Sequence, residues 1–165
     1  AVLVGRTSSD VVYNALSVAI MALTGLLVGW AIRTSFLEAA MGFGLLLLFA
    51  YAFSWVMAYV GLLVPSVEVI NNASFMVIFP ITFVSNAFVP LETLPPALQT
   101  FAEWNPVSSL TQAVRELFGN IPPGAPEPTA WPLQNPIVYT LIWIVIIMVI
   151  FVPISIRQYR RAARR

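Results

Sequence analysis

The sequence predicts an all-α, polytopic membrane protein with about four transmembrane helices and two short interfacial or re-entrant helices. Composition is the first observation: 59% of the 165 residues are hydrophobic and 9% are charged, whereas soluble domains carry about 25% charged residues. The second is a set of four apolar segments of roughly bilayer length. The third is a pair of short amphipathic segments before the last of them, typical of helices at a lipid–water boundary. Together they predict one transmembrane domain over residues 1–165.

The four apolar segments are residues 11–32, 37–64, 69–89 and 137–156. About 20 apolar residues in a helix are enough to cross the hydrocarbon core of a bilayer, so each segment is expected to span the membrane. Pro65 follows the second segment, and a proline cannot donate a hydrogen bond into a helix, so that helix should end there.

Side chains near the segment ends fit this placement. Trp55 and Tyr59 lie toward the end of the second segment, as aromatic interface anchors do, and Glu38 at its start reaches the interface. Gly25 and Gly29 form a small-xxx-small pair in the first segment. That pair indicates either close contact with another helix or the ordinary glycine content of transmembrane helices.

The third segment carries polar side chains at both of its ends, namely Asn71, Asn72, Ser74, Thr82, Ser85 and Asn86. Unpaired amides are costly in hydrocarbon, so these groups are expected to face other helices or a wet cavity. Two interpretations stay open, hydrogen bonds that hold helices together and a transport path. Glu68, just before the segment, is either a solvated helix cap or a contact for a partner.

The two short helices are expected at residues 95–104 and 106–118, where apolar residues repeat with helical spacing. Asn105 followed by Pro106 is a capping residue plus a proline in the first helical position, so the second helix should begin there. The residues predicted to form the hinges of this re-entrant unit are Pro95, Pro96, Asn105 and Pro106.

The stretch after the second short helix is predicted to contain no helix. Gly119 and Asn120 provide the stop signal for the helix before it. Residues 121–136 hold six prolines and should form a stiff, extended connector.

Four spans place both chain ends on the same side of the membrane, and the arginines indicate which side. Arg6 and the five arginines from Arg157 to Arg165 lie on one side, with Arg33 and Arg115 on the other. This asymmetry predicts a cytoplasmic C-terminus. A basic cluster is also found in solvated tails and nucleic-acid sites, but directly after a span it favours a membrane anchor, and no nucleic-acid partner is expected.

Catalytic chemistry is not predicted. The chain has no lysine for a phosphate-binding loop and no histidine for a triad or a metal site. It has no cysteine, and its seven acidic residues are scattered. We therefore expect no bound metal or cofactor and no enzyme activity within this chain.

An ordered set of motifs resembles the permease subunit of ABC-2-type exporters, most closely the daunorubicin-resistance-type branch. The set is a polar-started span ending in Phe88-Val89-Pro90-Leu91-Glu92-Thr93-Leu94-Pro95, an amphipathic helix, Asn105-Pro106, and a second helix with Val114-Arg115-Glu116. It covers residues 65–120.

The resemblance implies a six-helix permease in a bacterial plasma membrane, of which this chain would carry the last four spans. It also implies a partner ATPase subunit that binds the ATP, and a second permease copy or paralogue in a dimer. Arg6, Asp10 and Glu68 would then lie on the cytoplasmic side, where the ATPase docks.

The cargo implied by the resemblance is a hydrophobic or amphipathic compound, a drug, an antibiotic or a lipid, that leaves near the re-entrant helices. Its path would include Asn71, Asn72, Ser74, Phe75, Ser85 and Asn86, with Phe79, Phe83 and Phe88 as further aromatic surface. Polysaccharide cargo and a membrane anchor or assembly factor without a transport path remain as alternatives. A passive channel lacks a charged ring or a filter sequence.

Overall fold

The computed structural model describes residues 2–64 and 66–162, and in these ranges it contains helices and no strand. The elements are α1 (Val2–Leu27), α2 (Phe36–Leu63), α3 (Val67–Phe83), the 3₁₀ turn η1 (Leu91–Thr93), α4 (Pro96–Trp104), α5 (Pro106–Phe118), α6 (Trp131–Gln134) and α7 (Pro136–Ala162). Side chains are described from Ser9 to Arg160, apart from positions 65, 67 and 73. The all-α prediction is confirmed.

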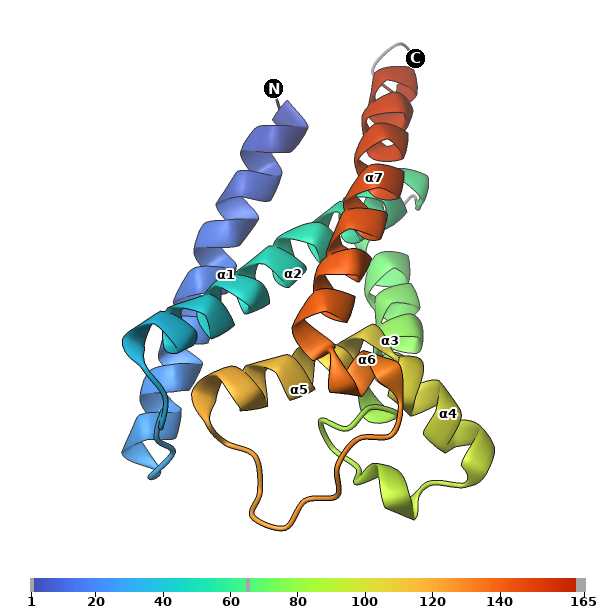
Figure 1. Cartoon of the computed structure of the whole chain (residues 1–165). Helices are drawn as coiled ribbons and strands as arrows, with labels where there is room; N and C mark the ends of the chain where they lie inside the picture. Colours follow the sequence, from blue (N-terminus) through green and yellow to red (C-terminus); the bar gives the residue numbers. More distant parts are fainter. Residues whose placement is uncertain (1, 65, 163–165) are drawn as a thin grey trace.

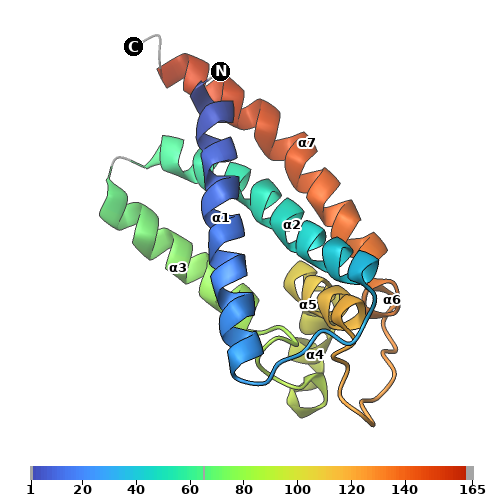
Figure 2. The same ribbon diagram turned by 90° about the vertical axis from the view of Figure 1, so that its left-hand side faces the viewer.

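Helix α2 is the centre of the bundle. It packs against α7, α5 and α1, and less extensively against α3. The start of α1 and the end of α7 lie at one end of the bundle, and α4, α5 and α6 lie at the other (Figure 1). Seen from the side, α3 and α7 flank α2 while α1 passes in front of it (Figure 2). The long helices thus run back and forth, and the short helices gather at the end away from the termini.

The packed interior, here called the three-helix core, lies between α2, α5 and α7. Its buried members are Leu45, Ala52, Ala113, Leu117, Ile144 and Ile147. Ala52 on α2 and Ala113 on α5 are fully buried, because small side chains let the two backbones approach closely. Trp55, one turn after Ala52 on α2, is also buried, at 2% exposed, and its carbonyl oxygen accepts the Ser155 hydroxyl of α7 at 3.3 Å. Helix α5 therefore contributes to the core through Ala113 and Leu117.

Helix α2 begins with a capping box. The Ser35 side chain accepts the Glu38 N–H at 3.3 Å, and the Glu38 carboxylate accepts the Ser35 N–H at 2.9 Å. These bonds satisfy two donors that a helix start otherwise leaves unpaired. The sequence prediction placed Glu38 near the interface but did not recognise this role.

The first helix was predicted at residues 11–32 and occupies Val2–Leu27. Gly29 lies beyond its end with φ +102°, in the left-handed region that glycine adopts readily. Gly25 instead packs near the Trp30 ring. The proposed Gly25–Gly29 contact face is therefore wrong, because only one of the two glycines is helical.

The third segment was predicted as a helix to residue 89, but α3 ends at Phe83. Pro80 sits in its last turn, where a proline removes one helical hydrogen bond and crowds the preceding turn. Among the described residues, three helices, α1, α2 and α7, are long and apolar enough to cross a membrane by length and composition, whereas α3 is a shorter apolar helix. Pro65, the predicted stop of α2, lies outside the described residues.

The other boundaries lie close to those predicted. The short helices, predicted at 95–104 and 106–118, are α4 and α5. The fourth segment, predicted at 137–156, is α7 and extends to Ala162. The connector at 121–136 is not wholly extended, because Trp131–Gln134 form a helical turn. Pro132 falls in its first turn, where the missing N–H has no helical partner to lose.

Candidate functional site

Four phenylalanines form a stacked row along and beyond α3. Phe75, Phe79 and Phe83 are spaced by four residues, so they share one helix face. Their ring centroids are 5.1 Å and 5.3 Å apart, with interplanar angles of 24° and 18°. Phe88 continues the row at 6.5 Å from Phe83, at 19°. All four rings are exposed within the chain, by 49% to 67%, so the row presents an open aromatic surface.

A groove of about 590 Å³ runs along this row. We call it the aromatic groove, and its lining residues are Asn71, Phe75, Ile78, Phe79, Thr82, Phe83 and Phe88. The lining is almost entirely apolar, with the Asn71 amide toward one end and the Thr82 hydroxyl farther along. Such a surface suits an apolar or aromatic molecule, because apolar contact supplies most of the binding free energy in ligand grooves.

A second hollow, the polar cleft, lies between α4, α5 and the loops on either side of them. It has a volume of about 640 Å³ and is lined by residues from 86–92, 99–103, 112–116 and 121–133. Its charged groups are Glu92, Glu103, Arg115, Glu116 and Glu127. Phe88 lines both hollows, so the aromatic groove meets the polar cleft at that ring.

Amides hold two of these carboxylates in place. Gln99 donates to Glu103 at 3.3 Å along α4, and Gln112 donates to Glu116 at 3.0 Å along α5. Arg115 and Glu116 are half-buried and belong to the cleft wall. The polar face of α5 therefore borders a hollow of the protein.

Asn105 joins three pieces of backbone at the start of α5. Its Oδ1 accepts the Val107 N–H at 2.9 Å, the hydrogen bond expected of a helix N-cap. Its Nδ2 donates to Ile81 O at 2.6 Å and to Val84 O at 2.9 Å. Asn105 is 3% exposed. One side chain thus caps the start of α5 and the end of α3; the sequence predicted only the first.

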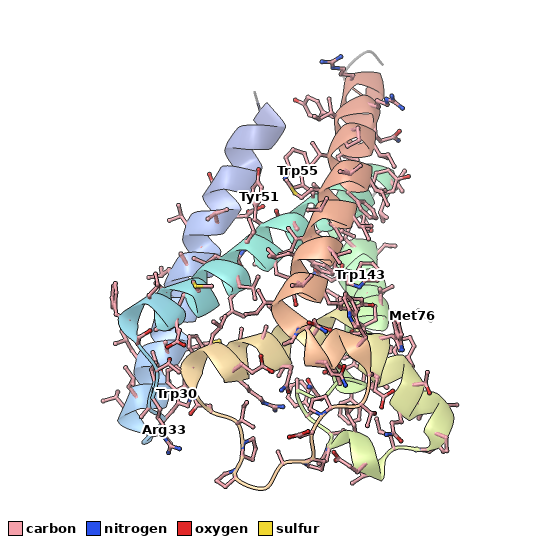
Figure 3. All side chains as sticks on the ribbon, in the orientation of Figure 1. Trp30, Arg33, Tyr51, Trp55, Met76 and Trp143 are labelled. Atoms are coloured by element: carbon pink, nitrogen blue, oxygen red, sulfur yellow. The ribbon has the colours of Figure 1, made fainter. Side chains whose placement is uncertain are left out.

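The other end of α5 is fastened to the loop between α1 and α2. Gly119 takes φ +67° and ends the helix. The Arg33 N–H donates to Phe118 O at 2.9 Å, and the Thr34 hydroxyl donates to Leu117 O at 2.5 Å. Trp30 packs edge-on against the Phe118 ring at 5.4 Å. Figure 3 shows Trp30 and Arg33 beside this end of α5.

Comparison with known proteins matches the sequence of this chain to a family. The model of the ABC-2 type transporter family matches residues 1–118, which include α1 to α5. The chain belongs to the ABC-2 type transporter family. It is therefore a membrane protein, and the resemblance drawn from residues 65–120 is confirmed.

One curated relative of this chain is a drug-resistance permease. The chain is 32% identical over 118 residues to the daunorubicin resistance ABC transporter permease protein DrrB1 of Streptomyces coeruleorubidus. The alignment covers 72% of this chain and 42% of that relative, so the chain spans less than half of the relative's length. No solved structure matches the chain.

The path residues predicted from sequence separate into three groups in this ABC-2 domain. Asn71 and Phe75 line the aromatic groove, and Asn86 lines the polar cleft. Asn72 is exposed on α3, and neither hollow includes it. Ser74 and Ser85 also lie outside both hollows.

Hydrogen bonding explains the position of Ser85. It is fully buried, and its hydroxyl donates to Thr82 O at 2.5 Å, so it stabilises the turn after α3. The Asn86 N–H donates to the Ser108 hydroxyl at 3.1 Å. Asn86 Oδ1 and Ser74 Oγ are buried without a partner among the described residues.

The predicted hinge prolines and the residues expected to face the ATPase lie at the ends of their helices or on α1. Pro95 precedes α4 and Pro96 is its first residue, while Pro106 begins α5. Asp10 is half-buried on α1 and Glu68 is exposed in the first turn of α3. The Arg6 side chain lies outside the described residues. In the described part of the chain, no group of three His, Cys, Asp or Glu side chains lies close enough to hold a metal.

Proposed function

We propose that this chain belongs to the permease subunit of an ATP-driven ABC-2-type exporter that moves hydrophobic or amphipathic compounds, such as a drug, an antibiotic or a lipid, out of the cytoplasm or the inner leaflet. The observation that carries the proposal is the aromatic groove, which meets the polar cleft at Phe88. An amphipathic molecule has an apolar part for the first surface and a polar part for the second.

In this proposal the rings of Phe75, Phe79 and Phe83 contact the apolar part of the cargo. Neighbouring rings stack at interplanar angles of 24° and 18°, so a cargo that lies along the row can contact more than one ring. Aromatic pairs contribute about 0.5–1.5 kcal/mol each beyond area burial, enough to select a cargo without holding it tightly. The DrrB1 relative is named for resistance to the drug daunorubicin, which supports this class of cargo.

Energy and directionality come from partners in this proposal. A separate ATPase subunit binds and hydrolyses the ATP, consistent with a chain that has no lysine for a phosphate-binding loop. It docks at the bundle end that holds the starts of α1 and α3, near Asp10 and Glu68. A second permease copy or paralogue faces the groove side of α3, and alternating access of the pair moves the cargo across the plasma membrane.

The test uses the whole permease with its ATPase in inside-out membrane vesicles, measuring ATP-driven uptake of a fluorescent hydrophobic dye. Phe79→Ala with Phe83→Ala should lower uptake about tenfold, since two aromatic contacts amount to roughly 1.4 kcal/mol or more. The matched control is Phe36→Ala with Phe101→Ala, which removes two exposed phenylalanines (91% and 53%) outside both hollows. Equal losses in the two variants would contradict the groove as the path. Uptake of an oligosaccharide but not the dye would contradict the cargo.

A further inference from the structure

We infer that Asn105 is a positioning residue that couples α3 to α5, and that α5 carries a displacement of the end of α3 to the turn between α1 and α2. The inference rests on the proposed transport function, because it assigns a mechanical role to a part of the exporter. Its evidence is separate from the aromatic groove and lies in the hydrogen bonds at the two ends of α5.

The end of α3 needs an outside donor. Helix ends leave carbonyl groups without helical partners, and a carbonyl shielded from water is costly to leave unpaired. The Val84 N–H still reaches Pro80 O at 2.9 Å, but the chain then leaves the helix. Asn105 Nδ2 supplies a donor to the oxygens of Ile81 and Val84 together.

The same side chain fixes the start of α5, so the two helix ends cannot separate without breaking its bonds. Because Oδ1 is held by the Val107 N–H, the amide is oriented with Nδ2 toward α3. A second bond links the same two segments, from the Asn86 N–H to the hydroxyl of the fully buried Ser108 on α5. Two neighbouring ties between the same pair of segments transmit rotation as well as translation.

The C-terminal end of α5 is also held by several hydrogen bonds. Beside the Arg33 and Thr34 bonds, Asn120 bridges the loop when its amide is oriented to satisfy both neighbours. Its nitrogen then donates to Ala31 O at 3.2 Å and its oxygen accepts from Trp30 Nε1 at 2.9 Å. Helix α5 is thus held at one end by α3 and at the other by the α1–α2 loop, with its buried face on the three-helix core.

The substitution that isolates this role is Asn105→Asp. Aspartate has nearly the same shape and is as good an N-cap as asparagine, so α5 can still begin at Pro106. It replaces the amide donor with an oxygen that faces two carbonyl oxygens. Asn135→Asp is the matched control, because Asn135 donates through Nδ2 to Trp131 O at 3.4 Å in an exposed position far from α3 in the chain.

The first measurement is transport per ATP hydrolysed, in the assembled permease–ATPase complex and normalised to the amount of complex. Asn105→Asp should lower transport per ATP at least fivefold while ATP hydrolysis stays within twofold of the unchanged protein; Asn135→Asp should change neither. A residue that only supports folding would lower both activities together through loss of complex. That result, or an unchanged ratio, overturns the inference. If the unchanged complex transports nothing, the proposed function fails instead.

A second measurement does not depend on the cargo. The chain has no cysteine, so spin labels can be attached at Met76→Cys on α3 and Phe36→Cys beside the α1–α2 loop, positions that are 79% and 91% exposed. Figure 3 shows Met76 at the edge of the molecule. The label-to-label distance distribution should stay narrow with and without ATP, and should broaden in Asn105→Asp. An unchanged distribution in that variant overturns the coupling.

Should Asn105→Asp fail to assemble, Thr34→Val tests the other end of α5. It removes the donor to Leu117 O while keeping the side-chain volume, and it should broaden the same distribution. Thr24→Val is its control, because the Thr24 hydroxyl bonds only within its own helix, to Ile20 O at 2.8 Å. Equal distributions in the two threonine variants overturn the inference.

Discussion

The three-helix core and helix α3 are both rich in apolar residues, but they differ in how far those residues are buried and in which contacts hold them. In the core, Ala52 and Ala113 are fully buried between helices, and packing holds the elements together. On α3, Phe75 and Met76 are 67% and 79% exposed; Asn105 donates to the end of the helix, and Ser108 accepts from Asn86 just after it. Apolar side chains are therefore packed into a scaffold in one region and exposed on the surface of the chain in the other.

The largest expected effect comes from removing a core side chain. Trp55→Ala should lower the free energy of unfolding by about 3 kcal/mol, the low end for a large aromatic residue in a core. The low end applies because the buried indole N–H has no partner among the described residues. Removing this unpaired donor relieves a destabilising feature and so offsets part of the free energy lost with the ring. Met76→Ala on α3 should change it by less than about 0.5 kcal/mol. Unfolding titrations in detergent measure both, and equal losses would erase the distinction between the two regions.

The next effect compares two glycines on α2. A Cβ at Gly42 would lie 2.6 Å from Cε1 of Phe118, whereas a Cβ at Gly44 would meet nothing within 4 Å. Gly42→Ala should therefore destabilise the protein by about 1–2 kcal/mol, since overpacking costs roughly 1–3 kcal/mol and alanine returns part of it through helix propensity.

Gly44→Ala should stabilise the protein by about 0.5–1 kcal/mol through the same propensity. Melting temperatures of the two variants in one detergent are the measurement. Shifts of the same sign would mean that α5 does not press on α2 at Phe118.

The smallest effect compares the caps of α2 and α3. Ser35→Ala breaks a reciprocal capping box and should cost about 1 kcal/mol. Ser66→Ala removes a single bond of 3.4 Å to the Val69 N–H and should cost about 0.5 kcal/mol, the low end of the range for a lost N-cap. Thermal unfolding of the two variants gives the order, and a larger loss in Ser66→Ala would contradict the view that α3 depends mainly on its other end.

The sequence predicted those features that local chemistry determines. Long apolar runs indicated the helices, and the Asn105-Pro106 pair and Gly119 bounded α5 correctly, because caps and stops act within a few residues. The end of α3 was predicted wrongly because it depends partly on a residue far away in the chain. The apolar run continues to residue 89, and a proline in the last turn together with a donor from 24 residues away ends the helix earlier.

The candidate site divides in the same way. The aromatic row was within reach of sequence reasoning, because Phe75, Phe79 and Phe83 recur every four residues on one helix. The polar cleft was not, since Glu92, Glu116 and Glu127 come from separate segments that only the folded chain brings together. Ser85 was predicted only in part. The sequence shows that it is polar, but its burial in the turn after α3 depends on how the folded chain packs.

The tie between Thr34 and Leu117 also sets an order of events during synthesis. The two residues are 83 positions apart, and a ribosome adds about 5–20 residues per second, so the α1–α2 loop waits roughly 4–17 s for the helix end that it binds. Throughout that interval Gly42 has no Phe118 ring against it. The newly made α1–α2 hairpin therefore lacks the hydrogen bonds that later hold its turn, and its final shape is completed only when α5 has been synthesised.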